Sequence, residues 1–202
     1  PPRQAIGMAA EGAYADGVLP GVLPGEVHAY TVVDYNFTWV ELLKLYFDLT
    51  GDRQFVIDLW PTLVKMLDRF AADRDPGGLI ISQPGRRLFL DWSSQSRREP
   101  SAIYNLRYLL ALQTAARLAG EGGLQCKEGA AWRQRAGPLR AAIRQAFCHD
   151  GRWHDDPERT TFSQLAAALA VLTGAAAEDE LAGQLEALLD RTLDMSDELS
   201  PG

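Results

Sequence analysis

Apolar residues recur with helical spacing along most of the chain beyond Asn36. Glycine or long polar stretches separate six such segments. Their spacing predicts helices over residues 37–49, 53–73, 101–119, 128–148, 161–173 and 178–194. Three of the segments are followed by Gly51, Gly120 and Gly174. Glycine adopts the left-handed conformation that commonly follows a helix end, so each is expected to stop its helix.

The six segments alternate in charge. The first, third and fifth carry few charged side chains, and none occurs between Thr161 and Thr173. The second, fourth and sixth are rich in charge and carry one apolar stripe. In the fourth segment the stripe consists of Trp132, Ala136, Leu139, Ile143 and Phe147. A helix that is apolar all round is buried on all sides, whereas a helix with one stripe lies at the surface. The pattern therefore predicts three inner helices, each followed by an outer helix.

The connections alternate as well. Most links from an inner to an outer helix are short, whereas the return links are long, at about 74–100 and 149–160. Helical hairpins with long loops at one end predict an all-α fold, an α/α toroid, since an α-solenoid has more uniform repeats. Three hairpins make about half of an (α/α)6 barrel. The expected domain is therefore a partial barrel over residues 1–202, with an irregular segment at 1–36 and three hairpins at 37–202.

An incomplete barrel has a physical consequence. The flanks of its inner helices lack neighbours and expose an apolar surface. Large patches of this kind usually bind a partner. We therefore expect self-association through the open edge.

Composition narrows the class of partner. The net charge of −7 and the isoelectric point near 5.0 argue against nucleic acid or an anionic membrane. No apolar run approaches the roughly 18 residues of a membrane span. The two cysteines, Cys126 and Cys148, lack paired spacing and are expected to be reduced thiols. With no signal peptide evident, the sequence favours a cytoplasmic location, although the missing initial Met predicts that the natural N-terminus lies upstream.

Metal and cofactor sites are not expected. The histidines and aspartates of "HDGRWHDD" (149–156) match no zinc spacing and instead predict a turn at Asp150-Gly151. The chain contains no P-loop, dinucleotide-binding, serine hydrolase or zinc protease motif.

Candidate binding residues lie in the long loops that enter the inner helices. The loops are "HAYTVVDYNFTW" (28–39), "FLDWSSQSRRE" (89–99) and "RWHDDPERTTFSQ" (152–164). At one end of a toroid such loops surround the cavity, where ligands usually bind. Aromatic faces stack on sugar rings, carboxylates bind vicinal hydroxyls, and paired carboxylates hydrolyse glycosides. The loops therefore favour a carbohydrate ligand.

Structural roles remain open for the same residues. These roles are helix capping for Asp34 or Asn36, a core position for Trp39, a packed turn for Asp91 and Trp92, and a solvated pair for Arg97 and Arg98.

The run "VVDYNFTWVELLKLYFDLTGDRQFVIDLWPTLVKMLDRF" (32–70) resembles bacterial α-L-rhamnosidases of glycoside hydrolase family 78 and related six-hairpin glycosidases. The resemblance continues through "FLDW", "SAIYNLRYLLALQTAARLAG" and "FSQLAAALAVLTG" and covers roughly residues 15–200. It implies hydrolysis of terminal α-L-rhamnosides by an inverting mechanism. It also implies sugar contacts for Asp34 and Trp39 in the first loop, and for Trp92 with Asp91 in the second.

The catalytic glutamates of this family are not expected in the chain. The family's general acid precedes the first segment seen here, and nothing similar lies before Asp34; the general base lies in a later hairpin. No catalytic residue is therefore assigned, Glu99 and Glu158 included, and the chain by itself is expected to be inactive. Two alternatives stay open. One is another six-hairpin glycosidase acting on glucosides or unsaturated uronides, and the other is a non-catalytic helical-repeat module that binds a protein.

Overall fold

The computed structural model describes residues 2–22, 31–90, 95–121, 124, 126–177, 180, 182, 183, 186 and 189. Within these ranges the helices are α1 (Pro2–Glu11), α2 (Val33–Thr50), α3 (Arg53–Ala72), α4 (Ala102–Gly120), α5 (Glu128–Phe147) and α6 (Gln164–Leu172). The strands are β1 (Thr31–Val32), β2 (Arg86–Arg87), β3 (Cys148–His149) and β4 (Arg152–Trp153). None of these helices is long and apolar enough to span a membrane.

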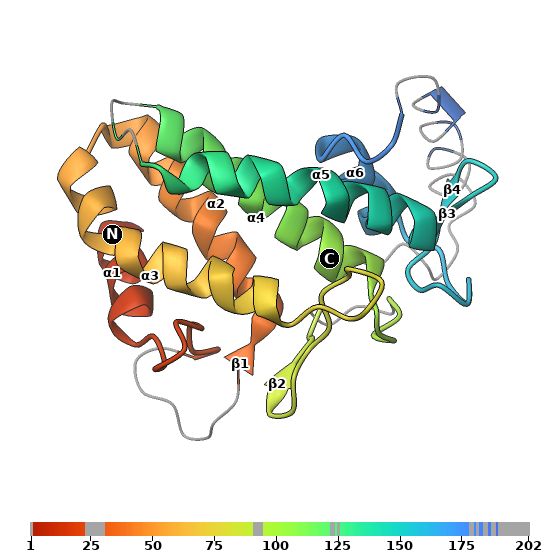
Figure 1. Ribbon diagram of the computed structural model, residues 1–202, viewed down its shortest axis with the longest axis horizontal. Helices are drawn as coiled ribbons and strands as arrows, with labels where there is room; N and C mark the ends of the chain where they lie inside the picture. Colours follow the sequence, from red (N-terminus) through yellow and green to blue (C-terminus); the bar gives the residue numbers. More distant parts are fainter. Residues whose placement is uncertain are drawn as a thin grey trace.

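The helices form two layers (Figure 1). The inner layer places α2 beside α4 and α4 beside α6, while α3 packs against α2 and α5 against α4 as the outer layer, which lies in front in Figure 1. The five helices predicted between residues 37 and 173 are confirmed, although α2 begins four residues early and α6 three residues late. The helix predicted over 178–194 falls mostly outside the described residues.

The N-terminal segment differs from the prediction. Residues 2–11 form α1, so the expectation of an irregular segment over 1–36 is wrong for this stretch. The buried residues of α1 are Ile6, Ala9 and Ala10. Two of the three are alanines, which contribute little to a hydrophobic pattern, and this explains why the sequence did not reveal the helix.

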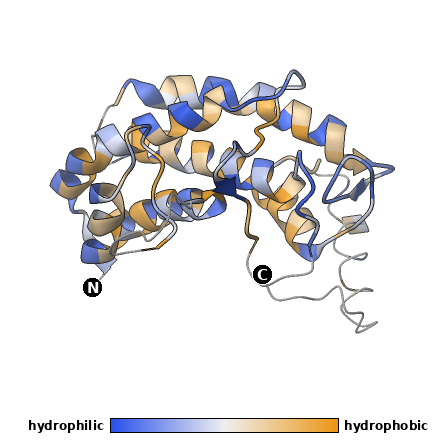
Figure 2. Ribbon diagram, turned by 90° about the horizontal axis from the view of Figure 1, so that it is seen from below, coloured by the Kyte–Doolittle hydropathy of each residue, from blue (hydrophilic) through white to orange (hydrophobic). Residues whose placement is uncertain are grey.

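Burial separates inner from outer helices as the charge pattern predicted. Helix α4 buries fourteen of its nineteen residues, whereas α5 buries six of twenty. Five of the six are the predicted stripe from Trp132 to Phe147. Figure 2 shows hydrophilic positions alternating with hydrophobic ones along the outer helices. Charged side chains need contact with solvent, so the helices that carry many of them form the outer layer.

Two of the three expected glycine stops are confirmed. Gly51 and Gly174 have φ values of 65° and 64°, in the left-handed region. Gly120 instead remains the last residue of α4, and the extended Glu121 follows it. The helix starts are fixed by side chains, since Asp52, Ser101 and Ser163 accept hydrogen bonds from backbone N–H groups three residues later.

The long loops contain short strands. Strand β1 pairs in parallel with β2, so the chain just before α2 lies against the loop that leads to α4. Strands β3 and β4 form an antiparallel hairpin. Asp150 and Gly151 connect them with φ values of 51° and 74°, which confirms the predicted Asp-Gly turn.

An aromatic cluster holds the first turns of α2 against α4. The ring centroid of Phe37 lies 4.8 Å from that of Phe70, 5.5 Å from that of Tyr104 and 5.4 Å from that of Tyr108. All four side chains are fully buried. This packing fixes the relative height of two inner helices and thereby of the loops that enter them.

Candidate functional site

The three inner helices begin at the same end of the molecule, which we call the mouth and define by their first residues, Val33, Ala102 and Gln164. Backbone bonds tie its loops together. The amide of Ala102 donates to the carbonyl of Asp155 at 2.9 Å, joining the start of α4 to the loop before α6. The β1–β2 pair joins the start of α2 to the loop before α4. The structure thus brings together the three loops in which binding residues were predicted.

Asp34 lies at the mouth but is almost completely buried, with 1% of its surface exposed. One carboxylate oxygen accepts a hydrogen bond from the amide of Phe89 at 3.2 Å. The N-cap of α2 is Val32, which makes no side-chain capping bond, so Asp34 is not the cap. Asp34 therefore holds the loop before α4 in place. Its predicted contact with sugar stays a prediction.

Trp39 does not lie at the mouth. Its side chain is buried, with 4% exposed, and its indole Nε1 donates to the carbonyl of Ile6 at 3.0 Å. These contacts favour the core position against α1 that was left open for Trp39, and its predicted sugar contact stays a prediction. Trp39 follows Asp34 by five residues and points about 140° away from it around the helix. The two side chains belong to different faces of α2.

Asp91 and Trp92 fall outside the described residues, so their predicted sugar contacts stay predictions. The described residues next to them are constrained. Leu90 is buried and has a φ of 49°, and Gln95 is also buried. Arg97 donates from Nε to the carbonyl of Phe89 at 2.8 Å.

Two asparagines hold the incoming loops. Asn36 accepts from the amide of Leu19 at 2.7 Å, and Asn105 accepts from the amide of Ile80 at 2.8 Å. The Asn105 side chain also donates to the carbonyl of Ile80 at 3.0 Å. Neither asparagine caps its helix. Buried backbone groups need such partners, and each asparagine supplies them to a loop that approaches an inner helix.

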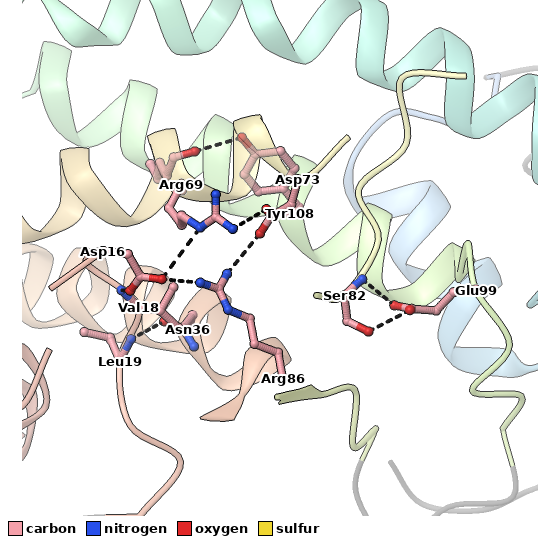
Figure 3. Close-up of polar contacts among 11 residues, drawn as sticks. Asp16, Val18, Leu19, Asn36, Arg69, Asp73, Ser82, Arg86, Glu99 and Tyr108 are labelled. Atoms are coloured by element: carbon pink, nitrogen blue, oxygen red, sulfur yellow. Dashed lines mark hydrogen bonds and ion pairs between the residues drawn. The ribbon is translucent and has the colours of Figure 1, made fainter. Parts of the chain in front are cut away.

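A cluster of charged side chains joins α3 to the N-terminal segment and to the loop before α4 (Figure 3). Arg69 and Arg86 donate to the two carboxylate oxygens of Asp73 at 2.7 and 2.9 Å, and both guanidinium groups also pair with Asp16. Burial raises the pKa of Asp73, while the two guanidinium groups oppose the rise. Because each carboxylate is paired, this cluster joins α3 to the loops rather than offering a free acid.

An open cavity of about 470 Å³ adjoins this cluster beside the β1–β2 pair. Its polar lining includes Tyr14, Asp16, Thr31 and Arg86. The hydroxyl of Tyr14 is buried and has no hydrogen-bond partner among the described residues. The cavity is large enough for a monosaccharide-sized ligand.

The carboxylates of the loop before α6 also accept hydrogen bonds from within that loop. Trp153, Asp155 and Asp156 are fully buried. Asp155 accepts from the hydroxyl of Ser163, whose own oxygen caps α6. Burial raises the pKa of Asp155. Burial also acts to raise the pKa of Asp156, but hydrogen bonds from Thr160 and other neighbouring groups outweigh it and lower the pKa.

The loop glutamates are engaged as well. Glu99 accepts hydrogen bonds from the amide and hydroxyl of Ser82 at 2.8 and 2.6 Å (Figure 3). Glu158 forms an exposed ion pair with Arg98 at 2.8 Å. Neither arrangement resembles the opposed acid and base of a glycosidase. Among the described residues, no group of His, Cys, Asp and Glu side chains is arranged to hold a metal ion.

One polar group was not assigned a role from the sequence. Arg107 on α4 donates to the hydroxyl of Thr38 on α2 at 3.1 Å, and its Nε is buried without a partner among the described residues. Burial raises the pKa of nearby Glu41, which the charge of Arg107 opposes, yet no ion pair joins the two. Thr38 and Glu41 lie one and two helical turns below Asp34. The sequence feature that could have identified Arg107 is its charge, which is rare on the otherwise apolar helix α4.

Comparison with known proteins places these observations in a family. Residues 3–202 match the family model of the bacterial alpha-L-rhamnosidase 6 hairpin glycosidase domain. The chain belongs to this family. It therefore has the α/α-toroid fold of the six-hairpin glycosidases and makes up about half of an (α/α)6 barrel.

Solved structures agree on the fold. A rhamnosidase from Klebsiella oxytoca with rhamnose bound superposes with a TM-score of 0.78 at 20% identity, covering 94% of this chain and 37% of that one. A family 78 rhamnosidase of Bacillus sp. GL1 gives 0.77 at 19% identity, covering 92% and 20%. The Streptomyces avermitilis alpha-L-rhamnosidase complexed with L-rhamnose gives 0.68 at 20% identity, covering 93% and 17%. The chain thus spans well under half the length of these proteins. No curated protein sequence matches it.

Proposed function

We propose that the protein containing this chain hydrolyses terminal α-L-rhamnosides, and that this chain supplies part of the sugar-binding mouth. The family match over residues 3–202 carries the proposal. Two of the similar structures hold rhamnose, which supports this sugar as the ligand. Membership of a glycosidase family supports hydrolase activity of the parent protein, and the printed names of the similar structures support the finer assignment of rhamnose as its substrate.

The proposed mechanism is inverting. One carboxylic acid protonates the leaving oxygen while a carboxylate about 6.5–9.5 Å away activates water on the opposite face of the sugar. Glu99 and Glu158 are held by Ser82 and Arg98 and are unsuited to these roles. We therefore assign the acid and the base to parts of the parent protein outside this chain, and we expect the chain alone to be inactive.

The proposed task of this chain is positioning. Asp34 fixes the backbone of Phe89, two residues before the Asp91-Trp92 pair to which the resemblance assigns sugar contacts. Asn36 and Asn105 fix the neighbouring loops. A rigid frame of this kind lowers the entropy lost when the sugar binds. Arg107, which donates to the hydroxyl of Thr38, and Glu41, whose pKa burial raises, place a donor and a carboxyl group below the mouth.

The decisive experiment uses the intact parent protein with an aryl α-L-rhamnoside. We expect release of the aryl group, and NMR of the first product formed should show β-L-rhamnose. Initial release of the α anomer would contradict the inverting mechanism. Activity restricted to an aryl glucoside or to an unsaturated uronide would favour the alternative glycosidase. Absence of activity on all three substrates, with a folded protein, would favour the non-catalytic module.

A further inference from the structure

A second pocket lies far from the mouth, between the last turns of α4 and the first half of α5. It has a volume of about 370 Å³ and is lined by Gln113, Ala116, Arg117, Arg133, Ala136 and Arg140. Arg117 follows the start of α4 by fifteen residues, which at 1.5 Å per residue places the pocket about 20 Å from the mouth. The cavity is therefore separate from the sugar-binding region.

The charged lining of this pocket has one sign. Three of its six residues are arginines and none is acidic. All three arginine side chains are exposed, so water and salt screen part of their mutual repulsion, and an anion bound among them would offset the remainder. The acidic residues at the adjoining helix ends have other partners, since Glu121 pairs with Lys44 at 2.8 Å and Glu128 accepts from Trp60 at 3.3 Å. Among the described residues, no ion pair involves any of the three arginines of this pocket.

Two of the guanidinium groups are held in place. Arg133 donates to the carbonyl of Ala116 at 3.3 Å, and Arg117 donates to the hydroxyl of Thr114 at 3.2 Å. Each of these bonds uses one terminal nitrogen and leaves further donors on the same group. Arg140 makes no hydrogen bond or ion pair among the described residues. The pocket thus combines two oriented donor groups with a third, exposed guanidinium group that has no partner in the described part of the chain.

We propose that this pocket binds a tetrahedral oxyanion of the phosphate or sulfate type. Arginine binds such groups through paired N–H···O bonds. Three guanidinium groups match an anion with at least three terminal oxygens better than a carboxylate, which has two. The free anion and the same group carried on a small molecule share this chemistry. The site is independent of the proposed rhamnoside hydrolysis.

The test is calorimetric titration of the full chain with inorganic phosphate and, separately, with sulfate, at constant ionic strength set by chloride. We expect saturable binding of at least one of them. Arg133→Gln with Arg140→Gln should weaken binding at least about tenfold, since a lost charge-assisted bond costs more than about 1.4 kcal/mol. The matched control is Arg152→Gln, an exposed arginine of β4 outside the pocket lining, which should leave the affinity unchanged.

Folding of the double variant is checked by circular dichroism. If it fails to fold, Arg140→Gln alone serves, because that side chain has no partner to lose among the described residues; a reduction of about threefold is expected. Equal affinity in the wild type and in the folded Arg133 and Arg140 variants would overturn the proposal. So would a calorimetric signal that chloride reproduces. Glucose 1-phosphate as a further titrant distinguishes the sources, since tighter binding than phosphate indicates a ligand that carries the group.

Discussion

Helices α2 and α4 are both inner helices with few charges, yet they are covered differently. Leu106, Leu109 and Leu112 on α4 are completely buried. On α2, in contrast, Leu42, Leu45 and Leu49 are 47%, 53% and 77% exposed. Helix α4 lies between α2 and α6 with α5 behind it, whereas on α2 one apolar face has no neighbour among the described residues. Low charge thus identifies an inner helix but does not reveal whether the array around it is complete.

Helices α2 and α4 hold their incoming loops in the same way at the mouth. Asn36 and Asn105 each stand four residues after the N-cap of their helix and bind the backbone of an incoming loop. In α6 the same position is Ala167, and buried Asp155 with Ser163 holds the loop instead. A polar anchor is therefore present at all three helix starts, but a carboxylate replaces the amide in the third.

The largest effect on stability is expected at Trp39, which lies on the face of α2 that α1 covers. Trp39→Ala should lower the free energy of unfolding by about 3–5 kcal/mol, because it leaves a cavity against α1. Trp39→Phe keeps a ring but loses the bond to Ile6, so about 1 kcal/mol is expected. Urea unfolding of the full chain measures both. Unchanged stability together with weaker sugar binding by the parent protein would contradict the core role and support the predicted sugar contact of Trp39.

The next effect compares the asparagines. Asn105→Ala leaves the amide and the carbonyl of Ile80 without their side-chain partner and should cost about 3 kcal/mol of unfolding free energy. Asn36→Ala leaves the amide of Leu19 without its partner, removes only a long bond of 3.5 Å to the carbonyl of Val32 besides, and should cost about 1–2 kcal/mol. Urea unfolding of the two variants side by side makes the comparison. A larger loss of unfolding free energy from Asn36→Ala than from Asn105→Ala would show that α2 depends more on its asparagine than α4 does.

The contribution of Asp155, the anchor before α6, to the stability of the fold should depend on pH. Burial raises the pKa of Asp155 above its ordinary value of 3.8. The contribution of this group to stability is therefore fully present below about pH 3.8 and is lost as the pH rises through the raised pKa. Asp155→Asn removes this titration. The variant should gain in free energy of unfolding relative to the wild type between about pH 4 and neutral pH. Urea titrations across this range give the difference, and a constant difference would contradict the assignment.

The smallest effect on stability is expected on the open face of α2. Leu45→Glu alters an exposed position and should change the unfolding free energy by no more than about 0.5 kcal/mol. If copies of the chain associate through this face, the charge should shift the chain toward monomer. Light scattering at increasing concentration measures the shift, and Glu186→Gln, at another exposed position, serves as a control. A wild-type chain that remains monomeric throughout would contradict self-association.

The sequence by itself determined the local features of this protein. The alternation of charge identified inner and outer helices, the stripe on α5 matched its buried face, and Asp150-Gly151 marked the turn between β3 and β4. These features depend on side-chain periodicity and backbone preference, which act over a few residues. The alternation of short and long connections predicted the toroid, and the ordered similarity to one family agreed with it.

Only the tertiary structure decided what the polar residues of the mouth bind. Asp34 takes its partner from 55 residues away, Asn105 from 25 and Trp39 from 33. Asp34 and Trp39 were visible in the sequence as candidates and Asn105 was not, yet a carboxylate, an amide or an indole has the same composition whether it contacts a ligand or a loop. The choice depends on which backbone groups folding brings within hydrogen-bond distance, and burial makes an unpaired group costly enough to enforce that choice.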